Sequence, residues 1–285
     1  MPSATIKLFL LHGDAKRLRT AELSNWTGKA VAGPRSELDG VLAREETGKS
    51  GVYFLSGIDP ESGKSALYVG EAESIRDRLR SHLDRDFWNH VIFFTSKDEN
   101  LTKAHIRYLE GRLIEQAKAA GRAVVMNGQS SGSQLPESDR EDMEIFLEKI
   151  HQLMPVLGAD ALLPIGAMPE SETEKQFLVC EIKGLQATGH LTPTGLVVLK
   201  GSQAVLTERP SAHQYPNTLA LRKRLIEDGT LVQDGDHLTF TRDTEFSSPS
   251  AAAAVVHGGS ANGLLAWKSK SGKTLKELEA LQPAA

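Results

Sequence analysis

The chain has 285 residues, of which 40 % are hydrophobic and 25 % charged, and its formal net charge is −4. This length is sufficient for two globular domains, and the charge excludes the overall basic character of many nucleic-acid binders. A single cysteine, Cys180, excludes an internal disulfide and zinc sites built on two or four cysteines. With no signal-like leader and no apolar run long enough to span a bilayer, we expect a cytoplasmic protein.

Three short strands are predicted before residue 48. They cover residues 5–11, 19–24 and 29–32. Pro34 ends the third strand, because proline cannot donate to a strand ladder, and Ser36 is expected to cap a short helix. We therefore expect residues 1–47 to form a β-rich extension packed on the domain that follows.

Residues 48–130 alternate strands and helices. Their apolar runs predict strands over 52–55, 66–69 and 91–94 and a long helix over 101–120. The first two strands flank a turn that contains Asp59-Pro60, which predicts a β-hairpin. Ile75, Leu79 and Leu83 recur every four residues, which predicts an amphipathic helix after the hairpin.

Glu110 lies inside the apolar face of the predicted long helix. The apolar residues of that arc are Leu109, Ala120, Leu113, Ile106, Ala117 and Ile114. A carboxylate on a buried face is costly unless it is paired or holds a metal. Three interpretations stay open: a metal ligand, a salt bridge to a neighbouring arginine, or a shorter helix with Glu110 at its rim.

Arg78 and His82 are four residues apart, so a helix places them on one face. They flank the apolar stripe of that helix and are expected to lean over the sheet toward Tyr53 and Tyr68. Arginine binds phosphate through a planar fork of donors, which favours a phosphate site. The alternatives are a solvated basic helix face and ordinary packing of the two tyrosines within the sheet.

The remaining residues predict a further helix and a second domain. Residues 131–176 are expected to hold a helix over 138–154, begun by a capping box of Ser138 and Glu141, and then a linker. Residues 177–285 are expected to form a smaller α+β domain. Its strands are predicted over 177–182, 195–199, 237–241 and 264–268, and its helices begin at Asn217, Ser248 and Thr274.

Six ordered motifs between residues 48 and 130 resemble those of one nuclease superfamily. They are Gly51-Val52-Tyr53, Tyr68-Val69-Gly70, Arg78, His82, Glu110 and Asn127. This pattern resembles the GIY-YIG nucleases, with valine in place of isoleucine in both tripeptides. The resemblance implies an α+β domain with a small central antiparallel sheet flanked by helices. Glu71 departs from the pattern, because repair-type members often carry lysine there.

The resemblance also implies metal-dependent hydrolysis of DNA phosphodiester bonds. Glu110 is then expected to hold Mg²⁺ or Mn²⁺, and Arg78 to neutralise the transition state. Tyr53 would be the general base, which requires help from a nearby cation because a free tyrosine has a pKa of about 10. Tyr68 would bind the water or phosphate, and His82 would orient Tyr53 or take its proton.

Other residues implied by the resemblance are expected to support the site. Gly70 and Asn127 are structural rather than chemical, and Asn127 closes the domain. Apart from the resemblance, the charge or stacking capacity of their side chains makes Arg76, Arg80, Trp267 and Lys268 candidate contacts to nucleic acid. For Trp267 the alternative is packing in a small core with Val255 and Leu275.

Residues from 198 onward resemble an uncharacterised domain often found C-terminal to GIY-YIG domains in bacterial proteins. The residues that carry this resemblance are 198–202, 221–226, 246–253, 262–263 and 267–268. Because the function of that domain is unknown, the resemblance predicts no chemistry for it.

Two rival functions stay open. The first is a catalytically weak or inert nucleic-acid-binding or protein-interaction module. The second is a complex-forming protein whose C-terminal domain recruits partners. The near-neutral charge of residues 48–130 favours them, because these residues contain 12 Lys and Arg against 11 Asp and Glu, a net charge of +1.

Overall fold

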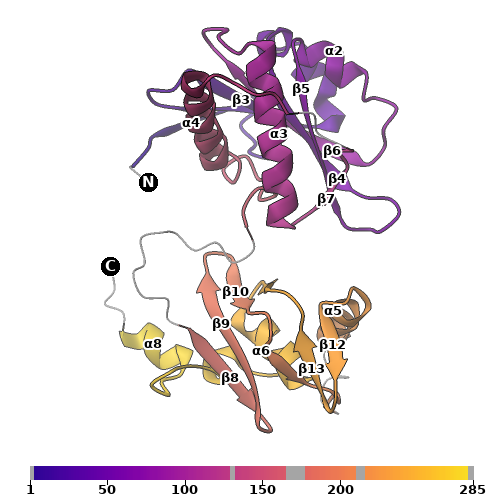
Figure 1. Cartoon of the computed structure of the whole chain (residues 1–285), viewed down its shortest axis with the longest axis vertical. Coiled ribbons are helices and arrows are strands. Elements are labelled where there is room, and N and C mark those ends of the chain that lie inside the picture. The colour runs from indigo at the N-terminus through magenta and orange to yellow at the C-terminus, as the bar shows by residue number, and fades with distance from the viewer. Residues whose placement is uncertain (1–2, 129–131, 165–176, 210–215, 282–285) are drawn as a thin grey trace. The chain divides into compact units, whose positions relative to one another are not determined.

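The computed structural model describes residues 3–128, 132–164, 177–209 and 216–281 (Figure 1). The chain divides into two compact units, residues 1–164 (unit 1) and 165–285 (unit 2). Both units mix helices and strands, which confirms the predicted α+β class. No helix within the described ranges is long and apolar enough to cross a membrane. Most of the linker expected before residue 177 lies outside the described residues.

Unit 1 is built on a sheet that has seven strands within the described residues, in the order β1-β2-β3-β6-β4-β5-β7. The strands are β1 Ile6–Leu10, β2 Arg19–Leu23, β3 Gly28–Pro34, β4 Gly51–Ile58, β5 Ser65–Ala72, β6 Trp88–Ser96 and β7 Val124–Val125. Only β5 and β7 pair in parallel among them. Because β3 pairs with β6 along its whole length, the N-terminal strands continue the sheet that carries the two tripeptide motifs.

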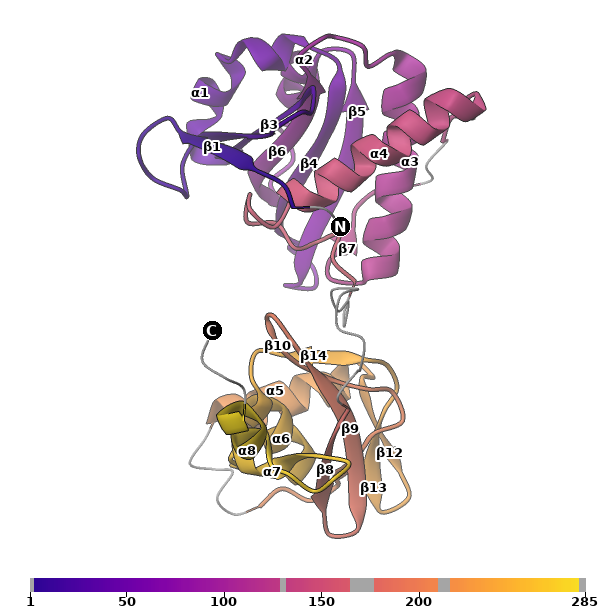
Figure 2. The ribbon, with the colours of Figure 1, turned by 90° about the vertical axis from the view of Figure 1, so that its left-hand side faces the viewer.

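Helices cover both faces of this sheet (Figures 1 and 2). One face packs against α3 (Lys103–Ala120) and α4 (Glu137–Leu153). The other face packs against α1 (Leu38–Leu42) and α2 (Ile75–Arg80), with the short turns η1 (Arg35–Glu37) and η2 (Glu45–Gly48) beside them.

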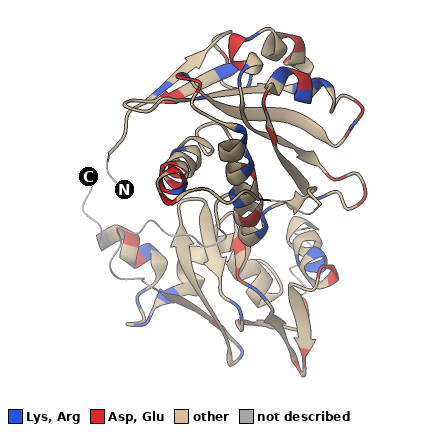
Figure 3. Ribbon diagram, turned by 45° about the horizontal axis from the view of Figure 1, so that its top comes forward, with Lys and Arg blue, Asp and Glu red and all other residues tan. Residues whose placement is uncertain are grey.

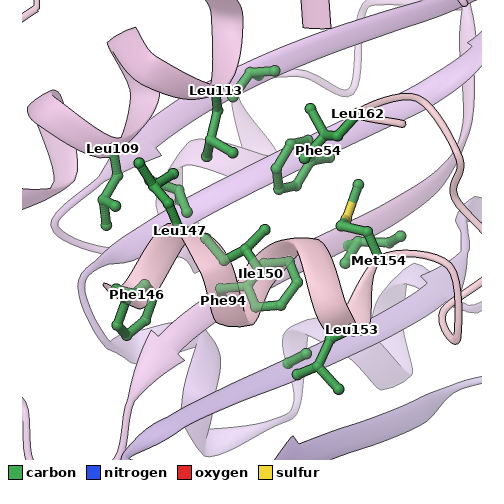
Figure 4. Packing of buried hydrophobic residues seen from close by; sticks show 14 of the residues in the cluster. Phe54, Phe94, Leu109, Leu113, Phe146, Leu147, Ile150, Leu153, Met154 and Leu162 are labelled. Carbon is green, nitrogen blue, oxygen red and sulfur yellow. The ribbon is translucent and has the colours of Figure 1, made fainter. Parts of the chain in front are cut away.

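Central strand β4 is buried on both faces because its alternate side chains enter different cores. Val52 and Phe54 point to α3 and α4, whereas Tyr53 and Leu55 join the core under α1 and α2. Figure 4 shows Phe54 among leucine and phenylalanine side chains of α3, α4 and β6. The apolar arc predicted for the long helix is buried at all six positions. Helix α4 likewise buries one face, made of Met143, Phe146, Leu147, Ile150 and Leu153.

Three local predictions are wrong. Ser36 does not cap α1, whose N-cap is Glu37 without a side-chain bond, and α4 begins at Glu137 without the expected capping box. Helix α2 ends at Arg80, which leaves Leu83 exposed. The backbone tightens there, since the amides of His82 and Leu83 bond to carbonyls only three residues before them.

Unit 2 packs two small sheets around α6. The described strands are β8 Leu178–Ile182, β9 Leu185–Thr192, β10 Gly195–Val198, β11 Gln203–Val205, β12 Leu231–Asp234, β13 His237–Phe240, β14 Thr244–Phe246 and β15 Trp267–Ser269. They form sheets in the orders β14-β10-β9-β8-β15 and β11-β13-β12. The helices are α5 Pro216–Glu227, α6 Pro249–His257, α7 Gly263–Ala266 and α8 Leu275–Leu281.

The start of α6 follows the prediction, because the Ser248 hydroxyl accepts from the Ala251 amide and Pro249 follows it. The strand expected over 264–268 is wrong in its first half. Asn262 caps the short helix α7 there, and pairing begins only at Trp267.

Candidate active site

Tyr53 lies at the centre of a hydrogen-bonded cluster between β4 and α2. Its side chain has no exposed surface, and its hydroxyl accepts from Nε of Arg78 at 3.1 Å. The same hydroxyl lies 2.8 Å from Nε2 of His82. Burial raises the pKa of Tyr53 above its ordinary value, and this effect outweighs the opposite influence of Arg78.

His82 follows α2 and is only 2 % exposed. Burial, together with the charges of Arg85 and Arg78, lowers the pKa of His82 to about 4. The ring is therefore neutral near pH 7, and in the tautomer protonated at Nδ1 its Nε2 is able to accept the Tyr53 hydroxyl proton. Nδ1 of His82 has no hydrogen-bond partner among the described residues.

Tyr68 is the tyrosine of the cluster that reaches solvent. Its ring centre lies 6.1 Å from that of Tyr53 and 5.1 Å from that of His82. Arg78 interacts with both tyrosines, which raises the pKa of its guanidinium, with Tyr53 as the larger influence. Arg78 itself is exposed, so it connects the buried hydroxyl to the surface.

Gly70 is required by the close approach of Tyr53 to β5. The two residues are paired in the hairpin, and a β-carbon on Gly70 would lie 2.3 Å from the Tyr53 hydroxyl oxygen. Gly51 meets a similar limit, since its β-carbon would lie 2.1 Å from the carbonyl oxygen of Phe94. The glycines of both tripeptides are therefore explained by packing.

The outer edge of β5 is closed by side chains beyond the short strand β7. The Leu67 carbonyl accepts from the Met126 amide at 2.8 Å. Asn127 then bonds both backbone groups of Val69, its Oδ1 accepting at 2.9 Å and its Nδ2 donating at 2.6 Å. This geometry agrees with the structural role expected for Asn127.

Glu110 lies at the same edge of β5, beside Glu71, which is two residues beyond Val69. Its half-buried carboxylate faces the backbone N–H of Glu71, which favours the charged form of Glu110. Burial raises the pKa of Glu110, and the negative charge of Glu71 raises it further against the opposing charges of Arg78 and Arg107. No ion pair within 4 Å neutralises Glu110 among the described residues, so the salt-bridge interpretation is not supported there.

Glu71 is paired with Lys103, an interaction that we did not predict. Lys103 Nζ lies 3.1 Å from Glu71 and 3.4 Å from Glu73. Lys103 is seven residues before Glu110 on α3, two helical turns along the same face. The seven-residue spacing between Lys103 and Glu110 was the sequence signal that could have predicted this pair. It places a lysine next to Glu71, the position at which repair-type GIY-YIG nucleases often carry lysine.

The donor set at this edge suits a hard divalent cation bound through few protein ligands. Glu110 experiences the negative charge of a second carboxylate, that of Glu71, and it also faces the Glu71 amide. Mg²⁺ is commonly held by one or two carboxylates, with water and phosphate oxygens completing its shell. Within the described ranges no group of three or more His, Cys, Asp or Glu residues is arranged to hold a metal.

Arg76 uses two of its three guanidinium nitrogens for bonds within the fold. Its guanidinium donates to the carbonyls of Leu42 and Arg44, each at 3.0 Å, and to the Thr47 hydroxyl at 3.1 Å. It therefore ties α2 to the segment that precedes β4. Arg80 remains exposed and makes a long ion pair of 3.8 Å with Asp77.

Trp267 and Lys268, the two candidate nucleic-acid contacts in unit 2, differ in their exposure. Trp267 is fully buried in one core with Val255 and Leu275, so stacking on a base is excluded and the packing alternative is confirmed. Lys268 is exposed and lines a hollow of about 620 Å³ together with Phe177 and Lys270.

Comparison with known families gives one match. Residues 178–279 match the model of a Domain of unknown function (DUF4357), which agrees with the resemblance drawn from the C-terminal residues. The match lies wholly within unit 2. No curated protein and no solved structure matches the chain.

Proposed function

We propose that the protein is a metal-dependent endonuclease of the GIY-YIG type that hydrolyses DNA phosphodiester bonds. The site would comprise Tyr53, Tyr68, Arg78, His82 and Glu110. One observation carries the proposal: Arg78 bonds the buried Tyr53 hydroxyl and interacts with Tyr68, while its charge also acts on Glu110. A single guanidinium thus bonds to the tyrosine cluster and acts through its charge on the carboxylate at the edge of β5, which suits the clamping of one phosphate.

Glu110 is the residue that would hold Mg²⁺ or Mn²⁺. When bound, such an ion supplies charge stabilisation for the phosphate and its leaving oxygen. The amide of Glu71 faces the Glu110 carboxylate and favours its charged form, and the charge of Glu71 increases the local preference for a cation. Arg78 would balance the charge that develops on the remaining phosphate oxygens.

Tyr53 would transfer protons without becoming a free phenolate. Its pKa is raised rather than lowered, so the direct general-base role expected from the sequence is disfavoured. However, its hydroxyl lies within hydrogen-bond distance of the neutral His82 ring, whose Nε2 accepts a proton when Nδ1 carries the ring proton. A proton received at the Tyr53 oxygen can therefore be matched by one delivered to Nε2 of His82. Tyr68, which reaches solvent, would bind the attacking water or the phosphate.

The alternative is an inert module that binds nucleic acid or protein. The charge of residues 48–130 favours it, and Figure 3 shows basic and acidic positions mixed along the elements of unit 1. The presence of Tyr53, Tyr68 and Arg78 in one cluster, with Glu110 within the influence of the Arg78 charge, favours the enzyme.

The test is cleavage by the full chain in Mg²⁺ or Mn²⁺ of duplex, branched and single-stranded DNA and of RNA. We expect cleavage of DNA that EDTA abolishes and that Glu110→Gln reduces at least 100-fold. The variant keeps an acceptor for the Glu71 amide and removes a repelled charge, so its melting temperature should not fall. Glu115→Gln, an exposed position on the same helix, is the matched control.

Two further variants distinguish the roles of Tyr53 and Tyr68. Tyr53→Phe should lose activity and about 1–3 kcal/mol of stability, because it leaves buried His82 without its partner. Tyr68→Phe should lose activity with little change in stability. Full activity of Glu110→Gln, or cleavage that is unaffected by EDTA, would contradict the proposed function.

A further inference from the structure

Arg85 is a second exposed arginine at the tyrosine cluster. Its guanidinium carbon lies over the ring of Tyr68, 5.0 Å from the ring centre. Asp84 and Asp86 flank it in the sequence, yet Arg85 forms no ion pair within 4 Å among the described residues. Its charge is therefore available at the surface beside the solvent-facing tyrosine.

The backbone that carries Arg85 is held by Arg35 of η1, on the same face of the sheet as α2. Arg35 donates to the carbonyls of Leu83, at 2.7 Å, and of Arg85, and it stacks 4.4 Å over the ring of Trp88. Nε1 of Trp88 in turn donates to the His82 carbonyl at 3.1 Å. These bonds fix residues 82–88, so Arg85 is presented from an ordered turn.

Arg78 and Arg85 converge on the same two side chains. Arg78 interacts with Tyr68, and Arg85 covers its ring face. Both positive charges also act on His82. Two guanidiniums that share neighbours and lack close carboxylate partners repel each other, and anions bound to them would relieve that repulsion.

We propose that Arg85 binds the phosphate next to the scissile one on the same nucleic-acid strand, with the Tyr68 ring as its platform. Arg78 then holds the scissile phosphate, and the pair sets the position of the strand on the site. This role rests on the proposed function. It also explains how a domain with little net positive charge binds a polyanion, since two fixed cations act at one point of the strand.

Binding can be measured apart from cleavage in the full chain that carries Glu110→Gln. The probes are a fluorescein-labelled DNA duplex and the matching single strand, titrated by anisotropy across a NaCl series. Adding Arg85→Ala should reduce the slope of log K against log salt by about 0.9 for the duplex or about 0.7 for the single strand. At 0.1 M salt this corresponds to roughly eightfold weaker duplex binding.

Two variants serve as controls. Arg85→Lys keeps the charge and should keep the salt slope, although it loses the planar stack. Arg140→Ala, an exposed arginine on α4 paired with Glu141, should leave both affinity and slope unchanged. Equal melting temperatures for the Arg85 variants and the parent would establish that the turn remains folded.

The outcomes separate this inference from the proposed function. If the parent binds and Arg85→Ala has the parent's slope, the inference is overturned while the nuclease proposal stands. If the parent binds neither probe and the wild-type chain cleaves none of the substrates, the proposed function is overturned and the inference with it. A reduced slope in Arg85→Ala that Arg85→Lys restores supports the inference.

Discussion

At the scale of single residues, the cluster separates two tyrosines that look equivalent in the sequence. Tyr53 is buried and bonded to both Arg78 and His82, whereas Tyr68 reaches solvent. The sequence identified both residues through the motif, but not this difference. Exposure depends on how the turn after α2 folds back over the hairpin, which local patterns do not determine.

His82 makes the stability of unit 1 depend on pH. The unfolded ring has an ordinary pKa near 6.5, and the folded one about 4, so the unfolded state binds more protons between these values. The stabilising contribution is complete above about pH 6.5 and decreases as the pH falls toward 4. Between pH 7 and pH 5 we expect His82 to account for a loss of about 2 kcal/mol.

Urea denaturation at pH 7 and pH 5 measures this loss. The loss should be smaller in His82→Gln than in the wild type by that amount. His90, whose pKa is also lowered to about 4 through burial and the charge of Arg19, should contribute in the same window. His90→Asn therefore serves as a comparison, and equal pH sensitivity of wild type and His82→Gln would contradict the prediction.

At the scale of elements, the hairpin and the long helix could be predicted because their signals are local. The hairpin strands, the buried arc of α3 and the cap of α6 all follow from residue type and period. The wrong predictions concern ends of elements. Serine is a favourable N-cap residue, so Ser36 and Ser138 were reasonable candidates. In the folded protein, however, the helices begin at Leu38 and Glu137.

Gly70→Ala tests the fit between the two hairpin strands. The new β-carbon would lie 2.3 Å from a fully buried ring that cannot move without breaking its bonds to Arg78 and His82. We expect a loss of about 1–3 kcal/mol and of cleavage. Gly48→Ala, which meets no atom within 4 Å, should change neither property in the same denaturation and cleavage assays.

At the scale of the whole molecule, the sequence predicts two units, but it only partly predicts which segments belong to each unit. Charge and motif spacing do not reveal that β3 pairs with β6, which joins the first 47 residues to the motif strands in one sheet. Such pairing is long-range and has no local signal. Helix α4 likewise belongs to the core of unit 1 rather than to a connecting segment.

Because every proposed site residue lies in unit 1, residues 1–164 should fold and cleave alone. We expect the fragment to have the same kcat as the full chain and to melt at the same temperature as unit 1 does within the full chain. A higher KM for the fragment would assign substrate binding to unit 2, where Lys268 lines the hollow. A shorter fragment, residues 48–164, should fail to fold, because it exposes the side of β6 that β3 covers.

The edge of β5 has a further consequence for the behaviour of variants. A sheet edge with free amides recruits strands from other molecules; here the Asn127 side chain bonds to the Val69 amide, and the Glu110 carboxylate faces the Glu71 amide. The carboxylate proposed to hold the metal thus also stops the sheet from growing. Glu110→Ala should therefore promote self-association where Glu110→Gln does not, and a loss of cleavage in the alanine variant alone would not separate chemistry from aggregation.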